Sequence, residues 1–130
     1  MTTTTTTAVD RLLEHVAGTR TDATETYAAD ATWDAVVPGW RFSVHGAERI
    51  GFQLAEWFGH PSEVEELERH TTPTGAVVTY TVTWEENGVP HAARHVHVLT
   101  IVDDRITRDQ AWCGGRWPAP LLAEMEAARR

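Results

Sequence analysis

The sequence contains no lysine, and all eleven of its positively charged residues are arginine. Without a lysine amine, Schiff-base chemistry and a P-loop are both excluded. The only cysteine is Cys113, so neither an intrachain disulfide nor a multi-cysteine zinc site can form. No apolar run approaches the ~20 residues that span a bilayer, and the N-terminus lacks the charged and apolar regions of a secretory signal. We therefore expect a cytoplasmic protein with no membrane partner.

The charge and composition are those of an acidic globular protein. The 130 residues carry a formal net charge of −8, with 42% hydrophobic and 23% charged residues. A chain without a basic stripe cannot replace the counterions of a phosphate backbone, so we expect no nucleic-acid partner. The length suits one domain, which we expect over residues 8–130. We expect residues 1–7, which are rich in β-branched threonine, to form a flexible lead-in.

Helical signals dominate the first part of the chain. Apolar residues at i, i+3, i+4 and i+7 predict a helix from Ala8 to near Gly18. The run "TDATETYAADA" predicts a second short helix, because Asp22 can serve as its N-cap and Glu25 follows at the spacing of a capping box.

A short hairpin and a third helix are predicted next. "TWDAVV" and "WRFSVHG" read as two strands that turn at Pro38-Gly39. "AERIGFQLAEWFG" follows as an amphipathic helix with Gly59 as its C-cap. The apolar face of this helix consists of Ile50, Leu54, Trp57 and Phe58.

After Pro61 the hydrophobic period changes to two. Four extended runs, "SEVEELERHTT", "AVVTYTVTWEEN", "HAARHVHVLTIV" and "RITRDQAWCG", are separated by turn signals, and "APLLAEMEAARR" predicts a C-terminal helix. In the second run, Val78, Tyr80, Val82 and Trp84 share one face of the strand, and threonines occupy the other. Helices followed by antiparallel strands predict an α+β domain, with the helices packed on one face of a curved, mainly antiparallel sheet.

The order of these elements, together with three phrases, resembles a known superfamily. "YAADATWD", "VHGAERI" and "VLTIVDDRITRDQAW" are similar to landmarks of the nuclear transport factor 2-like superfamily, including its SnoaL-like and ketosteroid isomerase-like branches. The resemblance spans roughly Ala8 to Trp117. It implies a cone-shaped domain whose sheet and helices enclose one pocket, often in a homodimer. It implies no single function, because this fold hosts isomerases, cyclases, hydrolases, dehydratases and non-catalytic modules.

The stretch "RHVHVLTIVDDRITRDQ" holds the first candidate site. Alternation puts His95 and His97 on one face, and the resemblance to ketosteroid isomerases implies that His97 points into the pocket. A three-residue loop over 102–104 would place His97 opposite Asp109, and a two-residue loop would place it opposite Gln110. In the first register the carboxylate would fix the imidazole tautomer and raise its basicity, which makes a general base. The alternative is a satisfied polar pair in a half-buried sheet.

Asp34, in "ATWDAVVP", is the second candidate catalytic carboxylate. The resemblance implies that this strand corresponds to the one in which isomerases carry their proton-shuttling aspartate, although the exact position of that aspartate falls on Ala35. A bulge before Pro38 would turn Asp34 into the pocket. Without one, Asp34 is an exposed carboxylate on a strand.

A metal site is a further reading of the same histidines. His95 and His97 form an H-x-H pair that, with Asp109, offers three metal ligands. Any short strand with two histidines offers such a pair, so we predict neither a metal nor another cofactor.

The supply of aromatic residues is large for this length, with six tryptophans among 130 residues. Each one is by default a core residue, but together they suit a flat, aromatic or polycyclic ligand. His15 joins them because the resemblance places it where isomerases carry a catalytic tyrosine. The predicted ligand-binding residues are His95, Trp33, Trp40, Tyr27, Tyr80, Trp84 and His15.

Three functions fit this pattern. The first is a SnoaL-like enzyme that performs cofactor-free acid–base chemistry on an apolar or polycyclic substrate, by isomerisation, cyclisation, dehydration or hydrolysis. His97 with Asp109 would be its acid–base pair, and Asp34 its second acid–base group. The second is a non-catalytic small-molecule-binding protein. The third is an interaction module whose pocket is filled by its own aromatic side chains.

The outer face of the predicted sheet indicates an assembly. It carries Thr79, Thr81, Thr83, Val96, Val98 and Thr100. These side chains are mostly β-branched and stiff, so they lose little conformational entropy when a partner covers them. We expect a homodimer through this face, with Val98 and Thr81 near the two-fold axis.

Overall fold

The computed structural model describes residues 7–58 and 60–129. These residues form three helices and seven strands. The helices are α1 (Ala8–Ala17), α2 (Ala47–Phe58) and α3 (Ala119–Ala128). The strands are β1 (Tyr27–Val37), β2 (Trp40–His45), β3 (Glu63–Thr72), β4 (Gly75–Glu86), β5 (Val89–Val102), β6 (Arg105–Cys113) and β7 (Trp117–Pro118).

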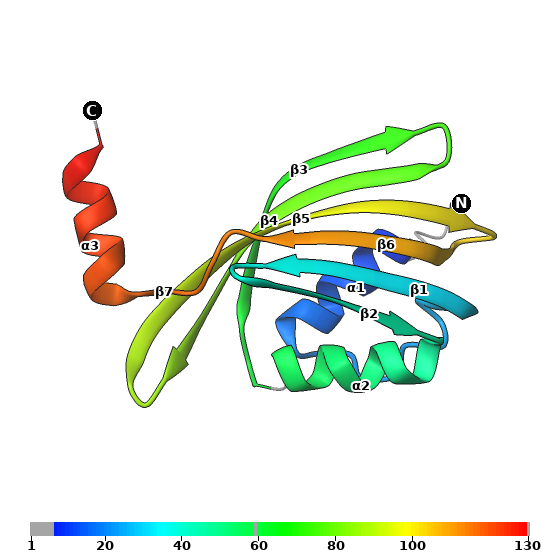
Figure 1. Ribbon diagram of the computed structural model, residues 1–130, viewed down its shortest axis with the longest axis horizontal. Coiled ribbons are helices and arrows are strands. Elements are labelled where there is room, and N and C mark those ends of the chain that lie inside the picture. Colours follow the sequence, from blue (N-terminus) through cyan, green and yellow to red (C-terminus); the bar gives the residue numbers. More distant parts are fainter. Residues whose placement is uncertain (1–6, 59, 130) are drawn as a thin grey trace, which may run out of the picture.

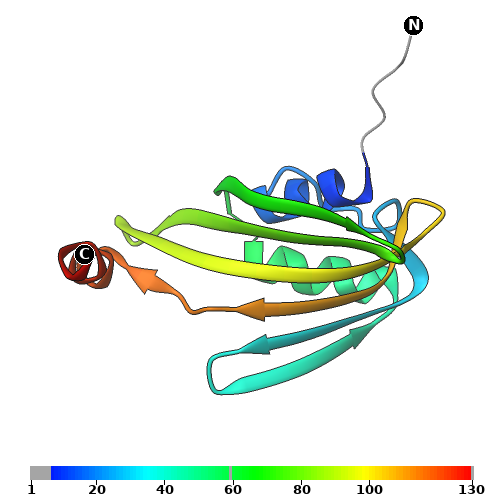
Figure 2. The same ribbon diagram turned by 90° about the horizontal axis from the view of Figure 1, so that it is seen from above.

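The strands belong to one sheet. Its order is β2-β1-β6-β5-β4-β3, and β7 pairs with β5 off this path. The β1–β6 pair is parallel and the other pairs are antiparallel. Figures 1 and 2 show the sheet curling around α1 and α2, with α3 standing beyond the edge of this body next to β7. The predicted α+β architecture, with helices on the concave face of a curved sheet, is confirmed.

The core lies between the concave face and the two N-terminal helices. Val78, Tyr80 and Val82 of β4 are buried, as the period-two pattern predicted. They belong to the same cluster of buried side chains as Leu12 of α1 and Leu54 of α2. The face that a residue of β4 or β5 occupies therefore decides whether its side chain enters the core or the convex surface of the sheet.

Helix α1 is capped at both ends and tied to the sheet. The Thr7 hydroxyl accepts a hydrogen bond from the Asp10 N–H, and the Asp10 carboxylate accepts one from the Thr7 N–H, which completes a capping box. Gly18, at φ +80°, closes the C-terminal end. The carboxylate of Asp104, in the β5–β6 turn, accepts from the first backbone N–H of α1 and from the guanidinium of Arg11. These bonds fix α1 across the open end of the sheet.

The predicted helix over "TDATETYAADA" is wrong. The Asp22 carboxylate accepts hydrogen bonds from the N–H and hydroxyl of Thr24, which makes a turn instead of a helix cap. Strand β1 begins at Tyr27 and pairs with both β2 and β6. Pairing of Tyr27 with β6 and of the residues from Thr32 on with both neighbours, together with burial of Tyr27, Ala31 and Trp33 in the core, overrides the helical propensity of the alanine-rich segment.

The β5–β6 hairpin begins in the second of the two predicted registers, the one with a two-residue loop, but His97 has neither of its predicted partners. Asp103 and Asp104 form a two-residue turn at φ +51° and +58°, the left-handed geometry that matches the twist of a tight hairpin. A bulge in β6 then shifts the pairing, so that His97 faces Ala111. Asp109 lies two residues before Ala111, and an even offset keeps it on the same face as His97. The predicted direct opposition is wrong, although the shared face is right.

Two predictions fall wholly or mostly outside the described residues: the helix cap at Gly59, and the flexible lead-in over residues 1–7, of which only Thr7 is described, as the N-cap of α1. Among the residues that the structure does describe, no helix is long and apolar enough to cross a membrane.

Candidate active site

A buried carboxylate lies at the inner end of a chain of hydrogen bonds. Asp109 has no exposed surface. Its Oδ2 accepts a hydrogen bond from the Tyr27 hydroxyl at 2.7 Å, and its Oδ1 lies 2.7 Å from Nδ1 of His97. Two donors at this distance suit an ionised carboxylate, which has only acceptor atoms. When the imidazole of His97 carries a single proton, Asp109 therefore fixes that proton on Nδ1.

The chain continues from His97 toward the surface through a tyrosine. The Tyr80 oxygen lies 2.8 Å from Nε2 of His97 and 2.9 Å from Nδ1 of His95. Since Nε2 of His97 is an acceptor in the tautomer above, the Tyr80 hydroxyl donates to it, and Nδ1–H of His95 donates to the Tyr80 oxygen. Nε2 of His95 is then left as an unprotonated acceptor, and no described residue hydrogen-bonds it.

The sheet registers bring these residues together. Tyr80 of β4 is the cross-strand partner of His95, and Val78 is the partner of His97, so Tyr80 sits between the two imidazoles on the concave face. Its ring stacks on that of His97 at 5.5 Å between centroids. Parallel pairing of β1 with β6 brings Tyr27 to the far side of Asp109. Four strands thus supply the five side chains: β1, β4, β5 and β6.

Burial fixes the protonation states along the chain. Burial, followed by the charge of Asp109, raises the pKa of both Tyr27 and Tyr80 well above the usual value, so both remain hydroxyls. Burial, with a further contribution from His97, lowers the pKa of His95 to about 3, so its imidazole is neutral near pH 7. Burial also raises the pKa of Cys113 and keeps it a thiol.

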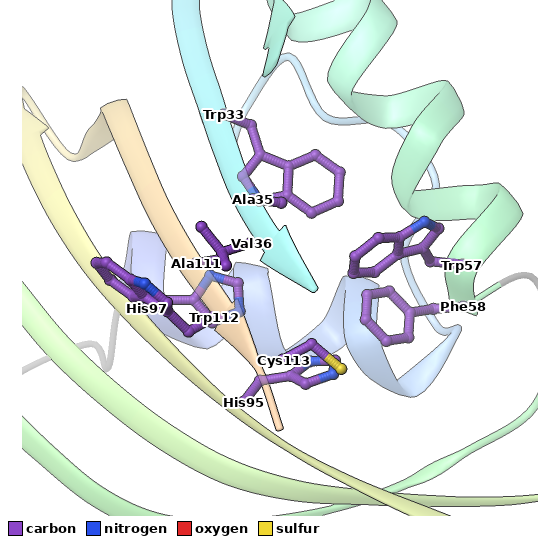
Figure 3. Close-up of a pocket in the computed structure, with 10 residues that line it drawn as sticks. All are labelled: Trp33, Ala35, Val36, Trp57, Phe58, His95, His97, Ala111, Trp112 and Cys113. Carbon is purple, nitrogen blue, oxygen red and sulfur yellow. The ribbon is translucent and has the colours of Figure 1, made fainter. Parts of the chain in front are cut away.

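Of the hydrogen-bonded side chains, His95 lies beside both a small cavity and a cleft. A cavity of about 10 Å³, the size of one water molecule, lies among the rings of Trp33, Trp57, Phe58 and the two histidines. Figure 3 shows these side chains converging from β1, α2 and β5, with Cys113 of β6 beside His95. A cleft of about 690 Å³, within the usual range for ligand pockets, shares Trp57, Phe58 and His95 with this cavity. The cleft thus leads from the surface down to the imidazole of His95.

The walls of the cleft are mainly apolar and aromatic. Trp57 and Phe58 lie 6.3 Å and 5.9 Å from His95 between ring centroids. On the opposite wall, Trp84 donates a hydrogen bond to Glu86 and lies under the guanidinium of Arg116 at 5.4 Å. Arg116 and Glu86 form an ion pair at this side of the cleft.

Trp33 carries a buried donor that no described residue satisfies. Its side chain is 1% exposed and lines the small cavity, and its Nε1–H has no hydrogen-bond partner in the described part of the chain. A buried donor without a partner costs on the order of 1–3 kcal/mol. An oxygen atom entering the cavity would remove that cost.

Most of the sequence-predicted site residues belong to this arrangement. His97 and Asp109 are in contact. The hydrogen-bonded chain also includes Tyr27, Tyr80 and His95, while Trp33 lines the cavity and Trp84 lines the cleft. The sequence identified Tyr80 as a ligand contact and missed that it bridges the two histidines. It also treated Trp57 and Phe58 only as a helix face, although their position in the last turn of α2 puts them beside the cleft.

Three predicted residues lie elsewhere. Asp34 pairs with Ser43 of β2 and with Arg108, on the convex face opposite to Trp33, because β1 has no bulge at this point. Its proposed role as a second acid–base group in the pocket is therefore wrong. Trp40 is 73% exposed at the β1–β2 turn. His15 is buried and hydrogen-bonds the Thr26 hydroxyl at 3.0 Å, outside the cavity and the cleft.

The predicted pair of histidines does not assemble a metal site. One nitrogen of His95 and both nitrogens of His97 are hydrogen-bonded to Tyr80 or Asp109. Within the described residues, no group of three or more histidine, cysteine, aspartate or glutamate side chains could hold a metal ion.

No family model matches the sequence, and no curated protein matches it either. Solved structures do match. A protein with a ketosteroid isomerase-like fold from Catenulispora acidiphila, in complex with trimethylamine, has a TM-score of 0.67 and 22% identity over 83% of this chain and 85% of its own. An LEH-like epoxide hydrolase from M. tuberculosis has a TM-score of 0.66 and 18% identity over 82% and 79%. A nuclear transport factor 2-like protein of unknown function from Mesorhizobium loti has a TM-score of 0.67 and 15% identity over 83% and 88%.

Proposed function

Given that the chain has the nuclear transport factor 2-like fold, we propose that it is an enzyme that performs cofactor-free acid–base chemistry on a small apolar molecule. The observation that carries this proposal is the buried chain from Tyr27 through Asp109, His97 and Tyr80 to His95, which ends in an unprotonated nitrogen at a cleft. Burying a carboxylate and two imidazoles costs free energy that an apolar core would avoid. Because the arrangement places groups that supply and accept protons at a cleft, proton transfer to or from a ligand is a function that accounts for this cost.

In this proposal His95 is the group that touches the substrate. Both nitrogens of His97 are occupied, and its side chain is 2% exposed, so it cannot receive a proton from a ligand directly. His95 lines both the cavity and the cleft, and Nε2 is its ring nitrogen that Tyr80 does not occupy. His95 acts as the general base, and His97 with Asp109 supports it from behind.

The surroundings restrict the substrate. The wall residues Trp57, Phe58 and Val82 favour a flat apolar body. The unsatisfied Nε1–H of Trp33 favours an oxygen atom at the inner end of the molecule. An uncharged ring compound with a carbonyl, hydroxyl or epoxide oxygen meets both conditions, and isomerisation, cyclisation, dehydration and hydrolysis are all reactions that one base and one donor can promote.

One observation favours a second function, that of a small-molecule-binding protein. The pKa of His95 is lowered to about 3, mainly by burial, so this imidazole by itself is a weak base. A neutral imidazole and an indole N–H are sufficient to orient a ligand without transforming it.

Turnover separates the two functions. The protein is incubated in D2O with a panel of uncharged cyclic ketones, enones, alcohols and epoxides, and products and deuterium incorporation are followed by NMR and mass spectrometry. We expect turnover or exchange of at least one compound, and its loss in His95→Asn, whose amide can still donate to Tyr80 but has no nitrogen in the place of Nε2. His70→Gln is the matched control, because that imidazole is 63% exposed on β3. If a compound binds in calorimetry, loses affinity in His95→Asn and is never transformed, the function is ligand binding and not catalysis.

A further inference from the structure

The hydrogen-bonded chain between the two histidines has two possible proton arrangements. We propose that Tyr80 relays a proton between His95 and His97, so that a proton taken up at the cleft appears as positive charge beside Asp109. The inference rests on the proposed function only where it assigns the relay a role in catalysis. The relay itself is a property of the five buried side chains.

The resting arrangement follows from the contacts. Nδ1–H of His95 donates to the Tyr80 oxygen at 2.9 Å, the Tyr80 hydroxyl donates to Nε2 of His97 at 2.8 Å, and Nδ1–H of His97 donates to Asp109 at 2.7 Å. All three bonds point inward, toward the carboxylate. The outermost nitrogen, Nε2 of His95, carries a lone pair.

The transfer needs two proton shifts and no change of heavy-atom contacts. A proton from the cleft binds Nε2 of His95. The proton on Nδ1 of His95 moves to the Tyr80 oxygen, while the hydroxyl proton of Tyr80 moves to Nε2 of His97. His95 is again neutral, now with Nε2–H; Tyr80 is again a hydroxyl, now donating to Nδ1 of His95; and His97 is an imidazolium. One proton has entered and one positive charge has been gained.

The electrostatics favour the charge on His97. That imidazole lies 2.7 Å from the carboxylate of Asp109, whereas the hydrogen-bond partner of His95 is a neutral hydroxyl. Burial, and next His97, lowers the pKa of His95 to about 3, so a charge does not remain there. Burial raises the pKa of Tyr80 well above its usual value, so the two shifts occur together and no tyrosinate forms.

The relay changes what the protein presents to the cleft. Before uptake, Nε2 of His95 accepts a hydrogen bond, and after uptake it donates one. A group that has removed a proton from a substrate is thus ready to return one at another atom, which is what an isomerisation or a dehydration requires. It also explains how a weakly basic imidazole can act as a base: the stable cation is His97, held in its ion pair.

Few other titratable groups face the two rings. Tyr80 comes from β4, Asp109 and Cys113 come from β6, and Tyr27 lies behind the carboxylate on β1. The residues of α2 packed against His95 are Trp57 and Phe58, which carry no charge; Glu56 lies farther out in the cleft wall. A titration of the histidine pair therefore reports on this network.

The test is nitrogen-15 NMR of the unliganded protein with labelled histidine, which distinguishes protonated from unprotonated ring nitrogens. As the pH falls, we expect His97 to gain its second N–H and His95 to exchange Nδ1–H for Nε2–H at the same midpoint. The relay is refuted if His95 carries both protons in the acid form, if its tautomer stays unchanged while His97 titrates, or if His97 stays neutral down to the acid unfolding of the protein.

A matched pair of variants adds a second criterion. Tyr80→Phe and Tyr27→Phe each remove one buried hydroxyl from the same network, but only the first interrupts the path between the histidines. We expect Tyr80→Phe to lose the tautomer exchange of His95, and Tyr27→Phe to keep it with a raised midpoint, because Asp109 has then lost a donor. Tautomer exchange that persists in Tyr80→Phe would refute the relay. These measurements use no substrate, so a failed relay and a failed search for turnover remain separate results.

Discussion

The substitution Asp109→Asn tests whether the buried carboxylate is kept for chemistry or for stability. The carboxylate is fully buried and accepts two hydrogen bonds of 2.7 Å. Each charge-assisted bond contributes about 1.5–3 kcal/mol, and the burial of the charge costs several kcal/mol. The two effects oppose each other, and asparagine has the same shape. We therefore expect the free energy of unfolding to change by less than about 2 kcal/mol.

Asp109→Ala provides the contrast. Alanine leaves the Tyr27 hydroxyl and the Nδ1–H of His97 buried without partners, at about 1–3 kcal/mol each. We expect this variant to lose roughly 2–6 kcal/mol, which urea unfolding followed by circular dichroism will measure.

Activity should not follow stability in Asp109→Asn, which we expect to keep most of its stability and to lose most of its activity. Without a carboxylate, His97 has no anion beside it, so we expect Asp109→Asn to lose on the order of 10²-fold or more of any proton-transfer rate. The reasoning is refuted if Asp109→Asn keeps the full rate of deuterium exchange, or if it is as unstable as Asp109→Ala.

Two further predictions concern the convex face and the dependence of stability on pH. We propose a homodimer through the convex face, where Val36, Val98 and Trp112 are 41%, 36% and 44% exposed. Light scattering at tens of micromolar should give a dimer mass for the natural sequence and a monomer mass for a folded Val98→Glu; a natural chain that is monomeric would contradict this. Burial, and next the charge of Arg20, lowers the pKa of His15 from 6.5 to about 4. The unfolded chain thus binds a proton before the folded one, so stability is lost as the pH falls from 6.5 toward 4. Between pH 7 and pH 5, His15→Gln should lose about 1–2 kcal/mol less than the natural protein in urea unfolding, and an equal loss in both would refute the assignment.

Period-two patterning explains why the sequence predicted much of the site. Along β5, alternation places His95 and His97 on the same face, and along β4 it places Tyr80 with the core residues Val78 and Val82. These assignments need only local geometry, because successive side chains of a strand point to opposite faces. Burial of the apolar members of each set then decides which face is concave.

The errors share one cause, which is that pairing between distant strands is not encoded locally. The segment before Trp33 has helical composition, but Tyr27 pairs with β6, Thr32 pairs with both β2 and β6, and the segment becomes strand. Asp34 would have needed a bulge between Trp33 and Pro38, but the irregularity of β1 lies earlier, between Tyr27 and Thr32. The β5–β6 loop is one residue shorter than the favoured prediction, and the bulge in β6 shifts the pairing once more in the same direction. The contact between His97 and Asp109 survives because these two shifts preserve the face.

The sequence by itself determined the sheet-forming half of the chain and the face that each polar residue of β4 and β5 occupies, since both follow from a repeat of two residues. Only the tertiary structure decided which of those residues touch. Tyr27 and Asp109 are 82 positions apart and meet because β1 and β6 pair in parallel, and Tyr80 reaches both histidines because β4 pairs with β5 in one particular register. A hydrogen bond forms only when its atoms lie within about 3 Å, and that distance is fixed by strand register and by the curvature of the sheet around α1 and α2.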